Sequence, residues 1–421
     1  MGAFASLPLL RGWSCWLRQF CRAFLSPNSV PHLEGAELYS DCPWGMEEEE
    51  AEEQRHGFAS YLAIPSISIA VDETNVQPGA LQLIGRLRPQ WETAQVKTKL
   101  FTDGITNKLM ACYTDENMRD AVLVRVYGRK TELIVDRASE LRNFQVLQDH
   151  GCAPSLYCTF ENGYCYEFVQ GKALGPEHVR QPQIFRLVAQ EMAKMHRIHT
   201  NGSLRKPCLW HRLYKYFNVV KTEFSRKTLN SCLHQEGPLP SLEVLEEEIC
   251  WMKEHLSQLG SPVVFCHNDL LSKNIIYNEA EGHVRFIDYE YTGYNYQAYD
   301  IGNHFNEFAG LNEVDYSLYP CKEIQLQWLK YYLQAFKKLS QEEPGEKGKN
   351  RGGSVVSEEE LETLYVQVNQ FALASHFLWA CWGLIQAQFS TIDFNFARYA
   401  DIRFKQYFKT KPIVTALKMS K

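Results

Sequence analysis

The stretch "HNDLLSKN", His267–Asn274, holds a histidine, an aspartate and an asparagine at fixed spacing, and Asp288 follows in "FIDYE". Short apolar runs flank these polar residues, with "SPVVF" before them and "NIIYN" and "GHVRFID" after them. Such runs predict short strands on either side of a loop. Loops held by strands are common positions for catalytic side chains, so the polar cluster is a candidate active site.

The spacing of these residues is similar to that of the protein-kinase catalytic loop, HxDxxxxN, which is followed by a strand and a metal-binding aspartate. Asp269 is the predicted catalytic base, because a carboxylate beside the attacking hydroxyl orients it and accepts its proton. Asn274 and Asp288 are the predicted Mg²⁺ ligands, because this hard cation prefers oxygen donors. We expect His267 to hydrogen-bond the loop backbone rather than act as an acid or base. The alternative is that His267 and Asp269 only cap turns.

The chain before this loop predicts a small strand-rich lobe, and the rest of the chain is mostly helical. The run "DAVLVRVYG" alternates apolar positions as a strand does, whereas "DRASELRNFQVLQDHG" and "QIFRLVAQEMAKMHRIH" have helical spacing. The predicted fold class is therefore α+β with two lobes. In the small lobe, "FTDGITNKL" predicts a turn over the phosphates of a nucleotide at Gly104, Thr106 and Asn107.

Three further residues of the small lobe are predicted to contact the nucleotide. Arg125 in "VLVRVYG" lies on a strand from which a cation can hold phosphates, and Glu140 on the following helix can pair with it. Glu167 lies in "YEFV", where a hinge strand contacts adenine through backbone groups. The alternatives are a solvent-facing strand cation for Arg125 and an ordinary exposed helix residue for Glu140.

Composition and charge argue against several classes of function. The 421 residues carry a formal net charge of −6 and no cluster of Lys and Arg, so nucleic-acid binding is not expected. The 13 cysteines are odd in number and include no CxxC pair, which favours reduced thiols and a cytoplasmic location. The most apolar segment, Phe371–Phe389, contains interrupting polar residues and lacks charged flanks. We therefore predict a buried core helix there rather than a stable transmembrane segment.

Three segments are predicted along the chain: an N-terminal tail at 1–60, a nucleotide-binding lobe at 61–170, and a helical lobe with the catalytic loop and acceptor pocket at 171–421. Residues 1–33 contain arginines and no acidic residue. A disordered tail, an amphipathic or mitochondrial targeting segment and an acylated N-terminus are all open for them. The polar, glycine-rich stretch 341–357 is predicted to be a surface loop or a disordered insert.

Three longer blocks resemble the choline/ethanolamine kinases: "HNDLLSKNIIYN", "FIDYEYTGYNYQAYDIGNHFNEFAG" and "FALASHFLWACWGLIQAQFSTIDF". The first block and "NHFNEFAG" resemble the ethanolamine kinases more closely than the choline kinases. The resemblance covers about residues 80–415. It implies a protein-kinase-like fold, ATP and Mg²⁺ as cofactors, and ethanolamine as the small-molecule substrate, whose product phosphoethanolamine feeds phosphatidylethanolamine synthesis. A choline kinase or a dual kinase is the alternative, because the width of the pocket cannot be measured from the sequence.

The resemblance also implies which residues bind the acceptor, a small cation that acidic groups and aromatic faces can recognise. Trp379 and Trp382 are three positions apart on a predicted helix and share a face, although core packing is the alternative for both. Asp300 and Asn303 lie near Glu307, the implied acceptor-binding carboxylate, in the sequence. We expect Asp300 to fix the catalytic loop through hydrogen bonds to its backbone. The implied acceptor-binding residues are Glu307, Trp379, Trp382 and Tyr399.

Three rival functions agree less well with the sequence. A protein kinase needs an activation segment ending in an APE-like motif, but "YEYTGYNYQAYDIGNHF" follows soon after Asp288. A catalytically dead scaffold is not favoured, because Asp269, Asn274 and Asp288 are all present. The tryptophan pair and the match around Glu307 argue against an aminoglycoside-type kinase. Members of the family are often dimers, so a homodimer is one state that the resemblance allows.

Overall fold

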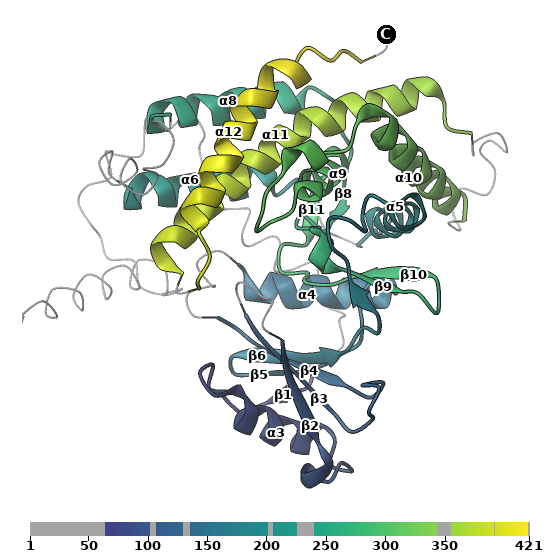
Figure 1. Cartoon of the computed structure of the whole chain (residues 1–421), viewed down its shortest axis with the longest axis vertical. Coiled ribbons are helices and arrows are strands. Elements are labelled where there is room, and N and C mark those ends of the chain that lie inside the picture. Colours follow the sequence, from purple (N-terminus) through teal and green to yellow (C-terminus); the bar gives the residue numbers. More distant parts are fainter. Residues whose placement is uncertain are drawn as a thin grey trace, which may run out of the picture. The chain divides into compact units, whose positions relative to one another are not determined.

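The computed structural model describes seven stretches of the chain, and the N-terminal residues 1–63, to which the targeting predictions apply, lie outside them. Within the described stretches, a lobe of strands is followed along the chain by a lobe of helices (Figure 1). The limits predicted for the three segments stay predictions. The described residues are 64–101, 107–128, 135–200, 205–224, 240–342, 355–390 and 392–419.

A six-stranded sheet forms the first lobe, in the order β1-β5-β6-β4-β3-β2. Strand β4 is buried along its whole length, because α3 (Val76–Leu87) packs on one face of the sheet and α4 (Arg137–Asp149) on the other (Figure 1). In register, Arg125 on β4 lies between Leu109 on β3 and Tyr164 on β6. The strands are β1 (Ser66–Ile67), β2 (Lys97–Phe101), β3 (Lys108–Tyr113), β4 (Val122–Val126), β5 (Leu156–Phe160) and β6 (Gly163–Glu167).

The two helices that the structure describes in this lobe differ in how strongly their sequences predict them. Helix α4 begins where it is predicted, because Asp136 caps its first turn by accepting the backbone N–H groups of Ala138 and Ser139. Helix α3 has no counterpart among the predicted elements. Helix α3 contains Pro78, which is tolerated in the first helical turn because no backbone N–H is needed there. The helix is stabilised by the packing of Leu83 and its apolar neighbours on the sheet.

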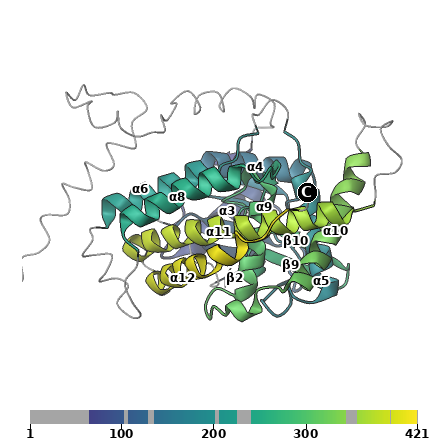
Figure 2. The ribbon, with the colours of Figure 1, turned by 90° about the horizontal axis from the view of Figure 1, so that it is seen from above.

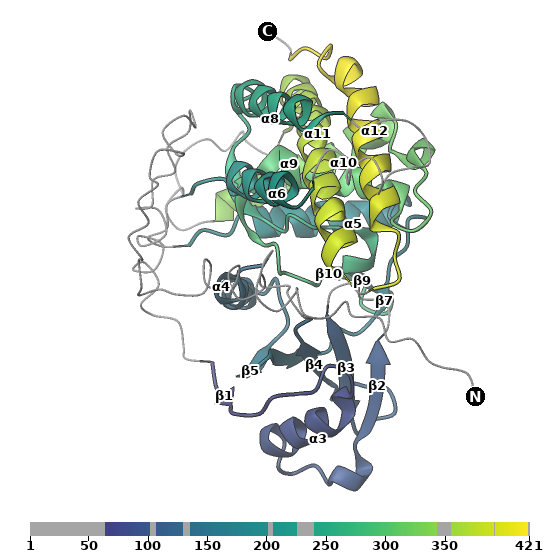
Figure 3. The same ribbon diagram turned by 90° about the vertical axis from the view of Figure 1, so that its left-hand side faces the viewer.

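The second lobe is built around α11, which is buried along most of its length. From Phe371 onward its sequence is mostly apolar on all sides, as expected for a helix enclosed by others. Figure 2 shows α6 and α8 on one side of α11, and Figure 3 shows α12 running alongside it. The helices are α5 (Pro182–His196), α6 (Leu209–Glu223), α8 (Leu242–Ser257), α9 (Gln297–Asn306), α10 (Lys322–Glu342), α11 (Glu358–Phe389) and α12 (Phe396–Val414).

The predicted core helix at Phe371–Phe389 is buried through Gln386, but it is the C-terminal part of a longer helix. Helix α11 already begins at Glu358, because Ser357 and Glu360 form a capping box in which each side chain accepts the other residue's backbone N–H. Most of the stretch predicted as a loop at 341–357 lies outside the described residues. None of the described helices is long and apolar enough to cross a membrane.

Two small sheets hold the candidate catalytic loop. Strand β8 pairs with β11, and β9 forms a hairpin with β10, so the strands predicted from the three flanking apolar runs are confirmed. The loop His267–Asn274 connects β8 to β9, and Asp288 follows β10. The pairing therefore brings both parts of the motif to one region. The strands are β7 (Lys172–Ala173), β8 (Val263–Cys266), β9 (Ile275–Asn278), β10 (His283–Phe286) and β11 (Gly293–Tyr296).

Candidate active site

A buried aspartate on α9 holds the backbone of the catalytic loop. Asp300 Oδ2 accepts the backbone N–H of His267 at 2.8 Å, and its Oδ1 accepts that of Asn268 at 2.7 Å. Asn268 has a φ of 67°, a left-handed conformation that asparagine tolerates better than most residues. Its side chain donates to the carbonyl oxygen of Tyr291 at 2.9 Å. These contacts agree with the predicted function of Asp300, which is to fix the loop through backbone hydrogen bonds.

Asp300 is itself held by His196 on α5. The Nε2 of His196 lies 2.9 Å from Asp300 Oδ2, and both side chains are fully buried. Burial opposes the charged form of Asp300, but the hydrogen bond from His196 and those from the loop backbone outweigh it and lower the pKa of the carboxyl.

His267 also has a structural function in this loop. Burial lowers its pKa, so the ring is neutral near pH 7. Its Nε2 donates to the carbonyl oxygen of Ile287 at 3.0 Å, and its Nδ1 accepts the N–H of Asp269 at 3.3 Å. Both bonds go to the backbone, as expected for a scaffold residue rather than an acid or base.

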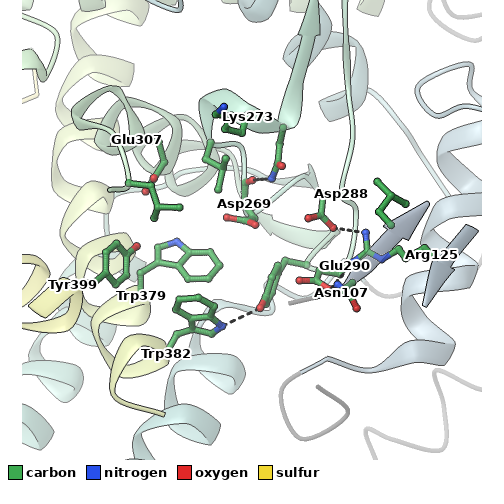
Figure 4. A pocket seen from close by; sticks show the side chains of 15 residues that line it. Asn107, Arg125, Asp269, Lys273, Asp288, Glu290, Glu307, Trp379, Trp382 and Tyr399 are labelled. Atoms are coloured by element: carbon green, nitrogen blue, oxygen red, sulfur yellow. Dashed lines mark hydrogen bonds and ion pairs between the residues drawn. The ribbon is translucent and has the colours of Figure 1, made fainter. Parts of the chain in front are cut away.

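Asp269 lines a cavity of about 150 Å³ together with Asn274 and Asp288 (Figure 4). Burial raises the pKa of Asp269 well above its usual value, and the nearby carboxylates of Asp288 and Glu307 raise it further. Asn274 Nδ2 donates to the backbone oxygen of Asp269 at 2.9 Å, which ties the short turn at Ser272–Asn274 to the loop. A hydroxyl group placed in this cavity has a carboxylate beside it that can accept its proton.

Arg125 connects the small lobe to the acidic end of the cavity. Its Nη1 donates to Asp288 Oδ1 at 2.7 Å, and its Nη2 donates to Glu290 Oε2 at 2.8 Å. The predicted ion pair with Glu140 is present at 3.7 Å, and Arg137 contacts the same Glu140 at 2.7 Å. Arg125 is therefore a buried cation among three carboxylates, and neither it nor the buried Glu140 is the exposed residue of the alternative interpretation.

Glu290 is a site residue that the kinase-like motif alone does not identify. It lines the cavity, and burial together with the charge of Asp288 raises its pKa to about 7. Asn107 Nδ2 donates to its Oε2 at 3.2 Å. The sequence signal is its place in "FIDYE", two positions after Asp288. That spacing does not show by itself that both carboxylates reach one cavity.

The oxygen donors at this end of the cavity fit a hard divalent cation. Asn274 offers an amide oxygen from the lining of the cavity. Asp288 and Glu290 offer carboxylates from the same lining (Figure 4). Sets of carboxylate and amide oxygens suit Mg²⁺. The structure thus brings the two predicted ligands, Asn274 and Asp288, together and adds Glu290 as a third oxygen donor.

The other end of the cavity combines aromatic rings with a carboxylate (Figure 4). Trp379 and Trp382 on α11 have ring centroids 5.6 Å apart, and Tyr399 on α12 lies 6.2 Å from Trp382. Glu307 lines the same space from the turn Glu307–Ala309 that follows α9. The rings are buried in the core and also line the cavity, so core packing and ligand contact are compatible here. Such a wall can hold a small cation.

Tyr291 belongs to this aromatic wall and was not among the predicted residues. Its hydroxyl oxygen accepts Trp382 Nε1 at 3.1 Å, and its ring centroid lies 5.2 Å from that of Trp379. It follows Glu290 directly in the chain, so one short segment contributes to both ends of the cavity. Aromatic residues are frequent in the core, and the sequence pattern does not separate this one from its neighbours.

Some predicted residues lie away from the cavity or outside the described residues. The Glu167 side chain accepts the N–H and the hydroxyl of Ser155, both at 3.0 Å, and its own N–H donates to Ser155 O at 2.9 Å. Its contact with adenine stays a prediction. Asn303 lies behind the wall, where its Oδ1 accepts Trp379 Nε1. Asn107 lines the cavity, whereas Gly104 and Thr106 lie outside the described residues.

Comparison with known proteins shows the relationships of this chain. Residues 98–408 match the family model described as choline/ethanolamine kinase. Ethanolamine kinase 2 of Rattus norvegicus is 60% identical over 398 residues, which cover 94% of this chain and 98% of that protein. Ethanolamine kinase 1 of Mus musculus is 59% identical over 360 residues, covering 85% of this chain and 96% of that protein.

The same relationship is visible in three dimensions. A solved structure of an ethanolamine kinase from Plasmodium vivax superposes on this chain with a TM-score of 0.66 at 26% identity. The match covers 86% of this chain and 94% of that chain. The prediction of an α+β, protein-kinase-like fold with two lobes is therefore confirmed.

Proposed function

The chain belongs to the choline/ethanolamine kinase family, and we propose that it transfers the γ-phosphoryl group of ATP to the hydroxyl group of ethanolamine. The identity of 60% with a protein named ethanolamine kinase 2 supports ethanolamine as the acceptor. One observation carries the proposal: Asp269 and Glu307 line the same cavity, so a base and a cation-binding carboxylate can face one small substrate. The alternative, a choline kinase or a dual kinase, is not favoured by these relatives.

The cavity supplies the groups that this transfer needs. The hydroxyl oxygen of ethanolamine forms a bond to the γ-phosphorus, the bond from that phosphorus to the bridging oxygen breaks, and ADP leaves. Asp269 accepts the hydroxyl proton, a function that suits a carboxylate with a raised pKa. Arg125 contacts the nucleotide phosphates from β4. Asn274 and Asp288 would hold Mg²⁺, which when bound would offset negative charge on the transferring group.

The acceptor end orients the substrate through its ammonium group. We place the ammonium against Glu307 and the aromatic faces of Trp379, Trp382 and Tyr399, so that the hydroxyl points toward Asp269. The primary ammonium of ethanolamine has three N–H donors, whereas choline has none. The Glu307 carboxylate can therefore accept a hydrogen bond from ethanolamine, and choline cannot form that bond.

Several properties of the protein stay predictions from the sequence and the family. These are a homodimer, a cytoplasmic location and the lack of nucleic-acid binding. The product, phosphoethanolamine, is a precursor for phosphatidylethanolamine, which places the reaction in phospholipid synthesis.

Release of ADP by the full-length protein tests the proposed function. Mg-ATP is supplied with ethanolamine, with choline or with no acceptor, beside an Asp269→Asn variant. We expect ethanolamine-dependent turnover that falls by about 10²- to 10⁴-fold in the variant. An equal or higher kcat/KM for choline refutes the preference for ethanolamine. No turnover with either amine refutes the activity.

A further inference from the structure

A chain of buried polar side chains behind the cavity connects its acceptor carboxylate with one of its indole rings. Arg403 on α12 donates through Nη1 to Glu307 Oε1 at 2.8 Å and through Nη2 to Ser375 Oγ at 3.1 Å. Ser375 on α11 donates to Asn303 Oδ1 at 2.8 Å, and the same oxygen accepts Trp379 Nε1 at 2.8 Å. Glu307 and Trp379 line the cavity, whereas the three residues that connect them are not among its described lining residues.

Chemistry fixes the directions of the hydrogen bonds in this chain. An indole N–H can only donate, so Asn303 must present its carbonyl oxygen to Trp379, and the Ser375 hydroxyl must donate to that oxygen. Two acceptor sites remain on the hydroxyl, and Arg403 Nη2 and Asn306 Nδ2 use them, both at 3.1 Å. Ser375 is therefore fully hydrogen-bonded, and its one hydroxyl group connects Asn303, Arg403 and Asn306.

The side chains of this hydrogen-bonded chain are buried. Ser375 and Asn303 are fully buried, Arg403 is 2% exposed and Glu307 is 5% exposed. A buried carboxylate and a buried guanidinium require each other, because an isolated buried charge is strongly unfavourable. Arg403 pairs with Oε1 of Glu307, and Oε2 has no hydrogen-bond partner among the residues that the structure describes. The carboxylate thus keeps one oxygen for a ligand in the cavity.

We propose that Arg403 and Ser375 are positioning residues that select for an acceptor with N–H groups, because they set the direction of Glu307 Oε2 relative to the Trp379 ring. This inference rests on the proposed function of Glu307 and Trp379 in binding ethanolamine. Arg403 already balances the charge of Glu307, so a bound cation gains less from net charge and more from a directed N–H bond. A quaternary ammonium has no N–H to direct and depends on the aromatic faces.

A series of acceptors that differ by one methyl group tests the inference. Ethanolamine, N-methylethanolamine, N,N-dimethylethanolamine and choline carry three, two, one and no N–H donors. The kcat/KM for each is measured with full-length wild-type protein, Ser375→Ala and Arg403→Lys. Ser375→Ala removes the central link with little change in volume. Arg403→Lys keeps the charge, but one ammonium cannot reproduce both bonds of the planar guanidinium.

Ser261→Ala is the matched control. Ser261 is another buried serine of the same lobe, and its Oγ accepts the backbone N–H of Ala298 at 3.1 Å, outside the chain of contacts described above. Its loss tests whether removing any buried hydroxyl is enough to change acceptor selectivity. Thermal unfolding of each variant verifies that the protein is folded. If Ser375→Ala does not fold, the acceptor series measured with Arg403→Lys tests the inference.

We expect both variants to lower the ratio of kcat/KM for ethanolamine to that for choline by about tenfold, the effect of one weakened charge-assisted hydrogen bond. The change should lie mainly in the KM for ethanolamine, with the KM for ATP and the ratio in Ser261→Ala unchanged. An unchanged ratio, or an equal loss with all four acceptors, overturns the inference. Wild-type protein without ethanolamine-dependent turnover overturns the proposed function instead.

Discussion

Replacing Arg125 by methionine tests whether the acidic end of the site depends on one buried cation. Methionine has a similar length and preserves apolar packing along β4, but it carries no charge. Arg125 is 5% exposed and contacts Asp288 at 2.7 Å, Glu290 at 2.8 Å and Glu140 at 3.7 Å. The substitution therefore leaves three carboxylates without their common partner.

The expected loss in the free energy of unfolding is about 3 kcal/mol near neutral pH. Removing one partner of a buried ion pair costs about 3–5 kcal/mol. The lower figure applies to Arg125→Met, because Arg137 still contacts Glu140 at 2.7 Å and Glu290 at 3.4 Å. The side chain of Asp288 is also 31% exposed, so water partly replaces the lost contact.

Guanidinium-induced unfolding of the full-length protein measures this loss. At about pH 9, where Glu290 is more fully ionised, adding Glu290→Gln to Arg125→Met should recover about 1–2 kcal/mol, because it removes a buried carboxylate that has lost its partner. Lys221→Met is the control, since it breaks an exposed ion pair with Glu246 at 2.9 Å and should cost less than about 1 kcal/mol. A loss below about 1 kcal/mol for Arg125→Met, or no recovery in the double variant, would refute the reasoning.

Three further predictions concern stability. Glu290→Gln should weaken the pH dependence of the protein's stability. Folding raises the pKa of Glu290 from 4.5 to about 7, so the folded protein holds this proton more tightly than the unfolded chain. The wild type should therefore lose stability as pH rises from about 4.5 through about 7, and an unaltered slope in the variant's thermal unfolding would contradict this. Gly302→Ala should destabilise the protein by about 1–3 kcal/mol, because its Cβ would lie 2.7 Å from the carbonyl oxygen of Val368, whereas Gly85→Ala on α3 meets no atom within 4 Å and should stabilise it by up to about 1 kcal/mol. Melting temperatures that shift in the same direction for these two variants would show that the space around Cβ does not decide the outcome. Asn268→Ala should be less stable than Asn268→Gly by about 1 kcal/mol, because φ is 67° there and both variants lose the same amide bonds; equal denaturation midpoints would exclude this.

The sequence by itself determined the catalytic loop and the central helix. His267, Asp269 and Asn274 lie in one stretch of eight residues, so their spacing describes a single local structure. The C-terminal part of α11, from Phe371 to Phe389, is mostly apolar on all sides, which already requires that other elements enclose it. Both predictions depend only on neighbours in the sequence, and such neighbours share a loop or a helix face whatever the remainder of the chain does.

Helix α3 shows where local signals are too weak. It contains Pro78, Gly79 and Gly85, three residues that lower helix propensity. Its helical form is stabilised by the burial of Ala80 and Leu83 against the sheet. Tertiary packing commonly outweighs propensity in this way, because most of the stability of a short helix comes from its buried face.

Only the tertiary structure decided which residues complete the site. Arg403 and Glu307 are 96 positions apart, and Arg125 and Asp288 are 163 apart, so no sequence period relates the members of either pair. Periodicity can assign Arg125 to a strand, but its partners depend on how β4 packs against the segment after β10. The physical reason is that a buried ion pair is stable only where several packed elements remove water from both partners and place them in contact. That condition is met by the folded lobes, and no single segment of the chain can meet it.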